Sequence, residues 1–209
     1  LRGLEHHYSI LEIDGNRRFT YDTLYFDTPG RQLYLDHHNG KLNRFKLRVR
    51  HYRETGGSFL EVKKKSNRER TIKNRLQLTS QTVANNRVIP FLEEQLGRPV
   101  AGMLPALFVG YRRMTLMSPM GTERITVDTG LGFHSPDRRN GFCLPDVAVL
   151  EVKYDRKIPY SPLLERLGQL GCRPAQFSKY CIGTSLLFGH ECKTNRFKPL
   201  LRRLHGICS

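Results

Sequence analysis

Five short stretches of the chain alternate charged and apolar residues with a period of two, and nearly all of their charges are positive. This is the period of a β-strand, so in each stretch the charges share one face while residues such as Leu47, Val49 and Val62 take the other. Like charges facing one another across a sheet are destabilising unless an anion lies between them. The pattern therefore predicts a sheet with one cationic face that binds a polyanion. The stretches are 46–50, 61–65, 73–75, 111–113 and 151–153.

The overall composition agrees with an anionic partner. The 209 residues include 35 Lys and Arg against 19 Asp and Glu, a net charge of +16, which raises the local concentration of anions. Phosphate compounds, nucleic acid and an anionic membrane surface are the candidate partners. No apolar run is long enough to span a bilayer and no signal peptide is recognisable, so we expect one soluble, cytoplasmic domain over residues 1–209. The five cysteines contain no C-x-x-C pair, which argues against a zinc site or a disulfide framework.

Alternating segments outnumber helical ones along the chain. Turn residues between alternating segments predict antiparallel hairpins, the first of them across Asp14, Gly15 and Asn16. We expect an α+β fold: an eight-stranded antiparallel β-barrel, closed or nearly closed, with a basic interior and with flanking helices that are mostly C-terminal. The expected strands are 8–13, 20–26, 45–52, 58–65, 70–78, 107–116, 122–133 and 147–157, and the expected helices are 89–96, 162–170 and 179–188.

Two acidic residues, Glu61 and Glu151, interrupt the basic faces. Arg and Lys hold phosphate oxygens through bidentate and point-charge contacts. Carboxylates beside phosphates are typical of Mg²⁺ or Mn²⁺ sites, because these cations take oxygen ligands from one or two carboxylates and from the substrate. Both residues are candidate metal ligands. The alternative is that each forms an ion pair with neighbouring lysines.

Several pieces of the chain, in order, resemble one family, the VTC domain, the polyphosphate polymerase branch of the triphosphate tunnel metalloenzymes in the CYTH-like superfamily. The resemblance implies a tunnel that binds ATP or polyphosphate, with Mn²⁺ or Mg²⁺ as cofactor. The matching pieces are Thr23-Leu-Tyr-Phe-Asp27, Lys46-Leu-Arg-Val-Arg-His-Tyr52, Phe59-Leu-Glu-Val-Lys63, Tyr111-Arg-Arg113, Arg124-Ile-Thr-Val-Asp-Thr129, Val149-Leu-Glu-Val-Lys153 and Phe177-Ser-Lys-Tyr180.

The resemblance also implies roles for single residues. Glu151 corresponds to the metal ligand, and Tyr111 to a residue that assists phosphate binding. By position, further basic residues are expected to line the tunnel and bind phosphate: Lys46, Lys73, Arg75 and Lys153. The residues that correspond to the family's phosphate contacts are Arg48, Arg50, Lys63, Arg113, Arg124 and Lys179, and the first five of these form the expected catalytic clamp together with Glu151.

One part of the family pattern has no counterpart. The family's first strand carries an E-R-K-like motif, and nothing before or near Leu1 matches it, since Glu5 lacks the right neighbours. We therefore expect an incomplete tunnel in this segment.

Four functions remain open at this point. The leading hypothesis is a metal-dependent polyphosphate polymerase that transfers the γ-phosphoryl group of ATP to a growing chain. The others are a tripolyphosphatase or nucleoside triphosphatase, a polyphosphate-binding sensor without turnover, and a nucleic-acid-binding protein. The last is disfavoured because the basic residues alternate with apolar ones on paired strands instead of lying among exposed stacking aromatics. A membrane-associated partner at the cytoplasmic face and the oligomeric state are left open.

Overall fold

A single curled antiparallel sheet organises the computed structural model, which describes residues 3–67, 71–154 and 160–208. Its nine strands follow the order β5-β4-β3-β2-β6-β7-β8, with β1 paired to β6 and β9 paired to β7. The strands are β1 (Ser9–Ile10), β2 (Phe19–Asp27), β3 (Arg44–Tyr52), β4 (Ser58–Lys65), β5 (Thr71–Gln77), β6 (Leu104–Met117), β7 (Glu123–His134), β8 (Gly141–Leu144) and β9 (Val149–Tyr154).

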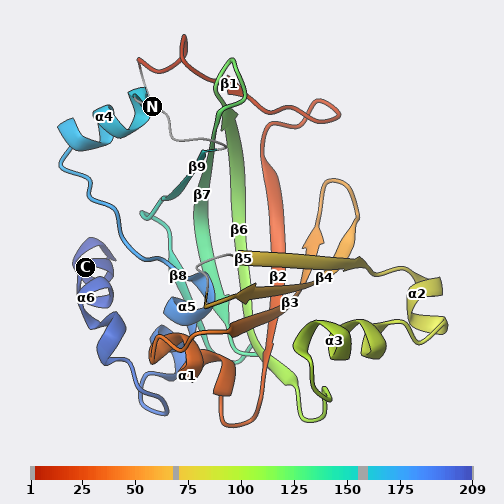
Figure 1. Cartoon of the computed structure of the whole chain (residues 1–209). Coiled ribbons are helices and arrows are strands. Elements are labelled where there is room, and N and C mark those ends of the chain that lie inside the picture. The colour runs from red at the N-terminus through yellow and green to blue at the C-terminus, as the bar shows by residue number, and fades with distance from the viewer. Residues whose placement is uncertain (1–2, 68–70, 155–159, 209) are drawn as a thin grey trace.

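The sheet curls without closing. In Figure 1, β3, β4 and β5 run across the long strands β2, β6 and β7, so that the sheet has a concave and a convex face. The prediction of an α+β fold with an antiparallel tunnel-like sheet is confirmed, but the closed eight-stranded barrel is wrong. The free side of β7 is divided between two short strands, β8 and β9. In the described part of the chain, neither of them pairs with β5.

The first predicted hairpin is also wrong. Ile10 of β1 pairs with Leu116 of β6 and not with β2, while β2 pairs with β3 on one side and β6 on the other. Only one isolated bridge, Ile13 to Asn16, forms across the expected turn. With its 14 residues, β6 is long enough to offer β1 a partner beyond the start of β2. The hairpins β3–β4 and β6–β7 form as predicted.

Six α-helices and one 3-10 helix flank the sheet in the described part of the chain. The helices predicted at 89–96, 162–170 and 179–188 are confirmed, and the end of the predicted strand 147–157 lies outside the described residues. The expected elements did not include α1, α2, η1, α6 or β8. The helices are α1 (Gln32–His38), α2 (Ser80–Ala84), α3 (Val88–Leu96), α4 (Pro162–Gln169), α5 (Lys179–Phe188), the 3-10 helix η1 (Asn195–Phe197) and α6 (Lys198–Cys208).

The apolar side chains form three clusters around the sheet. On the convex face, α3 packs Leu92 and Leu96 against the outward residues of β3 and β4. There too, α4 packs Leu163 against Ile125 and Val127 of β7. These contacts leave the inward residues of the same strands free to be polar.

On the concave face, α5 fills one end of the curl. Gly183 permits the close approach, because a Cβ there would lie 2.3 Å from Cδ1 of Phe133 and 2.8 Å from Cδ2 of Leu107. The rest of the concave face is therefore left to the charged residues. No helix in the described part of the chain is both long and apolar enough to span a membrane.

Candidate functional site

Glu61 of β4 is the centre of the first charged cluster on the concave face. Arg48 of β3 donates to its carboxylate at 2.6 Å, Arg50 lies at 4.0 Å, and Lys73 of β5 forms a short ion pair with its other oxygen. The Glu61 side chain is 1% exposed. Burial acts in the opposite direction, but the charges of Arg48 and Arg50 and the hydrogen bond from Lys73 lower the pKa of Glu61 to about 2. Glu61 therefore lies among cations as their counter-ion.

Asp128 of β7 is the centre of a second cluster. Arg113 donates to both of its oxygens, at 2.5 and 2.7 Å, and Lys179 donates to one of them at 2.5 Å. Although burial opposes the effect, the hydrogen bonds from Arg113 and the charge of Lys179 lower the pKa of Asp128. Like Glu61, Asp128 is 1% exposed. It fixes the orientation of the Arg113 and Lys179 side chains on the concave face.

Tyrosines of β2 and β6 join the two clusters. The rings of Tyr21 and Tyr111 stack, with centroids 5.1 Å apart, and the guanidinium groups of Arg50 and Arg113 each lie 5.2 Å from the Tyr21 centroid. Such cation–π contacts fix the guanidinium planes. The buried Tyr111 hydroxyl has no hydrogen-bond partner, so it remains available to an anion on the concave face. Tyr25 accepts a hydrogen bond from Arg48 at 3.1 Å.

Lys179 is placed by its neighbour on α5. The Tyr180 hydroxyl donates to Asp27 at 2.5 Å, and the same Asp27 carboxylate accepts from the backbone N–H groups of Leu33 and Tyr34 in the first turn of α1. Asp27 is 1% exposed. This carboxylate thus ties β2, α1 and α5 together and sets where α5 presents Lys179 to Asp128.

Glu151 of β9 lies in different surroundings from the other two acids. Its side chain is 51% exposed and forms an ion pair with Lys153 at 3.3 Å. Although burial opposes it, the charge of Lys153 and those of Arg113 and Lys63 lower the pKa of Glu151.

The donor atoms beside Glu151 fit a hard divalent cation. Thr126 is its direct neighbour across the β7–β9 ladder, is 4% exposed, and its hydroxyl has no hydrogen-bond partner. One carboxylate and one hydroxyl oxygen are typical of a Mg²⁺ or Mn²⁺ site that is completed by substrate phosphates and water. The described residues contain no group of three or more His, Cys, Asp or Glu that could hold a metal ion by themselves.

The structure brings the predicted site residues onto one face of the sheet. Lys46, Lys63 and Lys73 are register neighbours on adjacent strands, as are Arg48, Glu61 and Arg75. Arg124 and Lys153 also pair in register, at the exposed end of β7. Asp128 and Asp27 were not predicted as site residues, although both lie in the quoted motifs; the two-residue period from Arg124 through Thr126 to Asp128 is the signal that would have found the first.

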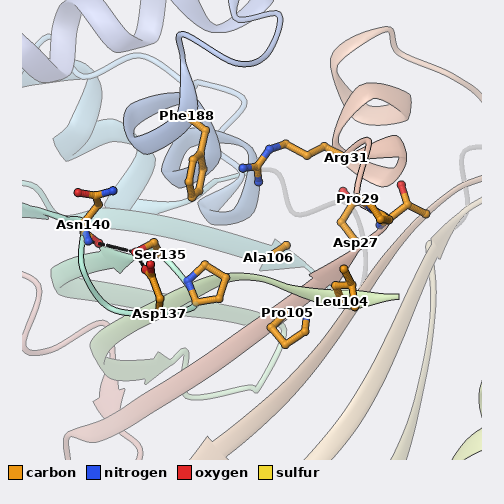
Figure 2. A pocket seen from close by; sticks show the side chains of 12 residues that line it. Asp27, Pro29, Arg31, Leu104, Pro105, Ala106, Ser135, Asp137, Asn140 and Phe188 are labelled. Atoms are coloured by element: carbon orange, nitrogen blue, oxygen red, sulfur yellow. Dashed lines mark hydrogen bonds between the residues drawn. The ribbon is translucent and has the colours of Figure 1, made fainter. Parts of the chain in front are cut away.

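A separate pocket of about 380 Å³ lies near α1 and the end of α5 (Figure 2). There the Arg31 guanidinium lies 3.9 Å from the Phe188 ring centroid and pairs with Glu191 at 3.3 Å. Asp137 and Asn140 form part of the opposite wall. Charges of both signs line this pocket, so it lacks the uniform positive charge of the concave face.

The comparisons with known proteins agree with this geometry. The model of the VTC domain family matches residues 1–188. The chain belongs to the VTC domain family. The predicted resemblance to the VTC domain family is therefore confirmed. No curated protein matches the sequence of this VTC domain.

Solved structures resemble this VTC domain at low sequence identity. A candidate adenylate cyclase from Bacillus halodurans is 11% identical with a TM-score of 0.50, covering 82% of this chain and 91% of its own. A candidate adenylyl cyclase from Hippeastrum, described as having a dominant triphosphatase activity, is 14% identical with a TM-score of 0.48, covering 87% and 95%. A Pyrococcus horikoshii protein is 12% identical with a TM-score of 0.48, covering 88% and 89%.

Proposed function

We propose that this VTC domain binds ATP and inorganic polyphosphate on its concave face and transfers the γ-phosphoryl group of ATP to the chain end, with Mn²⁺ or Mg²⁺ as cofactor. The observation that carries the proposal is the unequal state of the three acids. Glu61 and Asp128 are buried counter-ions of the cations, whereas Glu151 is half-exposed on the same face. A cationic surface fixed by its own buried acids is suited to a phosphate chain.

The same observation favours transfer of the phosphoryl group to another phosphate over its transfer to water. The phosphate end of a chain is already an anion and attacks without losing a proton, whereas attack by water is assisted by a general base. Because Glu61 and Asp128 are each ion-paired with two or more cationic groups, neither carboxylate is free to accept a proton from water. The nucleophile that suits this face best is therefore another phosphate.

The reaction then needs positioning and charge neutralisation. An oxygen of the chain end attacks the γ-phosphorus, the bond from the γ-phosphorus to the β–γ bridging oxygen breaks, and ADP leaves with that oxygen. Arg48, Arg50, Lys63, Arg113 and Arg124 neutralise the equatorial and leaving oxygens. The phosphate positions between the clamp residues are further bounded by Lys46, Lys73, Arg75, Tyr111, Lys153 and Lys179.

The metal would be held by Glu151 together with the Thr126 hydroxyl. When bound, a divalent cation supplies charge neutralisation on the terminal phosphates of the nucleotide. We keep Glu151 as the proposed metal ligand. Glu61, the second predicted ligand, is a weaker proposal, because its three cationic partners would have to release it first.

The test is a product assay with ATP and Mn²⁺, with products resolved by gel and by phosphate release. We expect a ladder of polyphosphate from the unmodified domain and a loss of about 100-fold in Glu151→Gln. Glu94→Gln, a change at an exposed acid on α3, is the matched control and should keep full turnover. Orthophosphate without a ladder would replace the polymerase with a triphosphatase.

One observation favours a second candidate, a binding module without turnover. With one half-exposed carboxylate and no three-ligand cluster among the described residues, the protein's own hold on a metal is weak. Tight binding of tripolyphosphate that is unchanged in Glu151→Gln, with no turnover by either protein, would establish the binding module.

A further inference from the structure

A pocket of about 530 Å³ continues the concave face past Lys46 and Lys63. Its walls come from the ends of β3 and β4, the turn after α1, the segment before α5, and η1. Its cationic lining residues are Arg44, Lys46, Lys63, Lys65 and Arg196, and its described lining contains no Asp or Glu. The pocket therefore differs from the Glu61 and Asp128 clusters, where a buried carboxylate neutralises the cations.

Arg196 is held at the rim of this pocket by α1 and the turn after it. Its Nη1 donates to the carbonyl oxygen of His38 at 3.1 Å. A Cβ at Gly40 would lie 2.6 Å from the same Nη1, so the absence of a side chain there leaves room for the guanidinium. Arg196 comes after residue 188, beyond the part that matches the VTC family model. The pocket thus joins family residues to a cation from this chain's C-terminal segment.

Lys46 and the first turn of α5 form the inner wall. Ser178 caps this ten-residue helix by accepting from the Cys181 N–H at 3.2 Å, and the Lys46 ammonium donates to the same hydroxyl at 2.9 Å. The positive end of the helix dipole therefore adds to the charge of Lys46.

His37 adds no compensating negative charge to the pocket. Its Nδ1 accepts from Arg44 Nε at 3.1 Å, while its Nε2 lies 3.2 Å from the Phe45 carbonyl oxygen. Burial and the charges of Lys46 and Arg44 lower the pKa of His37 to about 3, so the ring is a neutral acceptor that orients Arg44. No described residue of the pocket lining supplies a counter-charge to these cations.

We propose that this pocket binds the phosphate units of a polyphosphate chain that extend beyond the catalytic clamp, so that Lys65 and Arg196 select for chain length. The inference rests on the proposed function and specifies its substrate. Lys63 belongs to both the pocket and the clamp, and Lys46 is its neighbour across the β3–β4 ladder, so one chain can pass from one to the other without a break in positive charge. A triphosphate that fills the clamp does not need the pocket.

The test compares two ligands on a double variant, Lys65→Gln with Arg196→Gln, by calorimetric titration with tripolyphosphate and with long-chain polyphosphate. We expect long-chain binding to weaken about tenfold, because two charge-assisted contacts are lost. Tripolyphosphate binding should stay within about twofold. The control combines Arg166→Gln, on α4 of the convex face, with Arg17→Gln. It removes the same charge and should change neither affinity.

The outcomes separate the two proposals. An unchanged long-chain affinity overturns the length-selecting pocket while leaving the proposed function standing, and so does an equal loss for both ligands, which would mean a general field effect. Orthophosphate binding that the double variant abolishes, without any dependence on chain length, would make the pocket a site for free phosphate and also overturn the proposal. If the unmodified domain binds neither ligand, the proposed function itself fails. Thermal unfolding of the double variant checks that the fold is kept.

Discussion

The buried and the half-exposed regions of the concave face carry acids of opposite character. Glu61 and Asp128, on β4 and β7, are 1% exposed and contact cations directly, whereas Glu151, on β9, is 51% exposed with Lys153 as its recorded ion-pair partner. Burial of a charge is tolerated only where partners compensate it. Glu61 and Asp128 therefore hold the cationic face together without a ligand, while Glu151 is available to bind a ligand.

The largest effect on stability is expected at Asp128. In Asp128→Asn, Arg113 and Lys179 lose the charge that both contact, and breaking a buried pair by removing one partner costs about 3–5 kcal/mol. Urea unfolding measures the loss. Glu94→Gln, which removes an exposed carboxylate, should change the free energy of unfolding by less than about 0.5 kcal/mol. Similar values for the two variants would contradict the assignment of Asp128 as a structural counter-ion.

A slightly smaller loss, about 3 kcal/mol, is expected for Glu61→Gln, since one of the cations around it, Lys73, is 40% exposed. In this variant Arg48, Arg50 and Lys73 have no buried counter-ion. A bound anion should therefore stabilise the variant more than it stabilises the unmodified domain. We expect tripolyphosphate to raise the melting temperature of Glu61→Gln by more than it raises that of the unmodified domain. An equal rise in both would show that the phosphate does not contact this cluster.

Acid pH should reproduce part of the Glu61 effect. Its pKa is lowered from 4.5 to about 2 in the folded protein, so its contribution to stability is complete above pH about 4.5 and is lost as the pH falls toward about 2. Stability measured across this range should fall less steeply in Glu61→Gln than in the unmodified domain. Parallel curves would contradict the pairing.

The smallest effect on stability belongs to Glu151. Exposed ion pairs contribute about 0–1 kcal/mol, so the free energy of unfolding of Glu151→Gln should stay within about 0.5 kcal/mol of that of the unmodified domain, in contrast to the large loss expected for its proposed turnover. A large destabilisation would remove the distinction between Glu151 and the two buried acids and would make it a third counter-ion.

Much of the fold was predictable because its signals are local. The two-residue period of Lys46, Arg48 and Arg50 identified a strand and its charged face, and the turn residues identified two hairpins. The partner of β1 was not predictable, because it depends on the length of β6 and on no nearby residue. Closure failed as a prediction for the same reason: β7 shares its free side between β8 and β9, and no local pattern records that division.

The candidate site divides in a similar way. Basic residues are visible in the sequence as a pattern, but the partners of an acid are not. Glu61 and Glu151 stand in nearly identical contexts, Leu-Glu-Val-Lys, yet one is enclosed by cations from β3 and β5 and the other lies on a half-exposed strand. The residues on the neighbouring strands therefore determine whether each carboxylate is buried and paired. The contact between Asp128 and Lys179 likewise joins residues 51 positions apart.

The close packing at Gly183 has a consequence for the chemistry of Lys179, one helical turn away. Lys179 precedes Gly183 by four positions on α5, so the two lie on the same side of the helix. Because the backbone at Gly183 contacts Phe133 and Leu107 without an intervening side chain, the height of the helix above the sheet is set there. The distance between the helix and the sheet in turn sets how close the Lys179 ammonium lies to Asp128. Gly183, which has no functional group, therefore sets the distance between the charges of Lys179 and Asp128. A methyl group at position 183 would increase that distance.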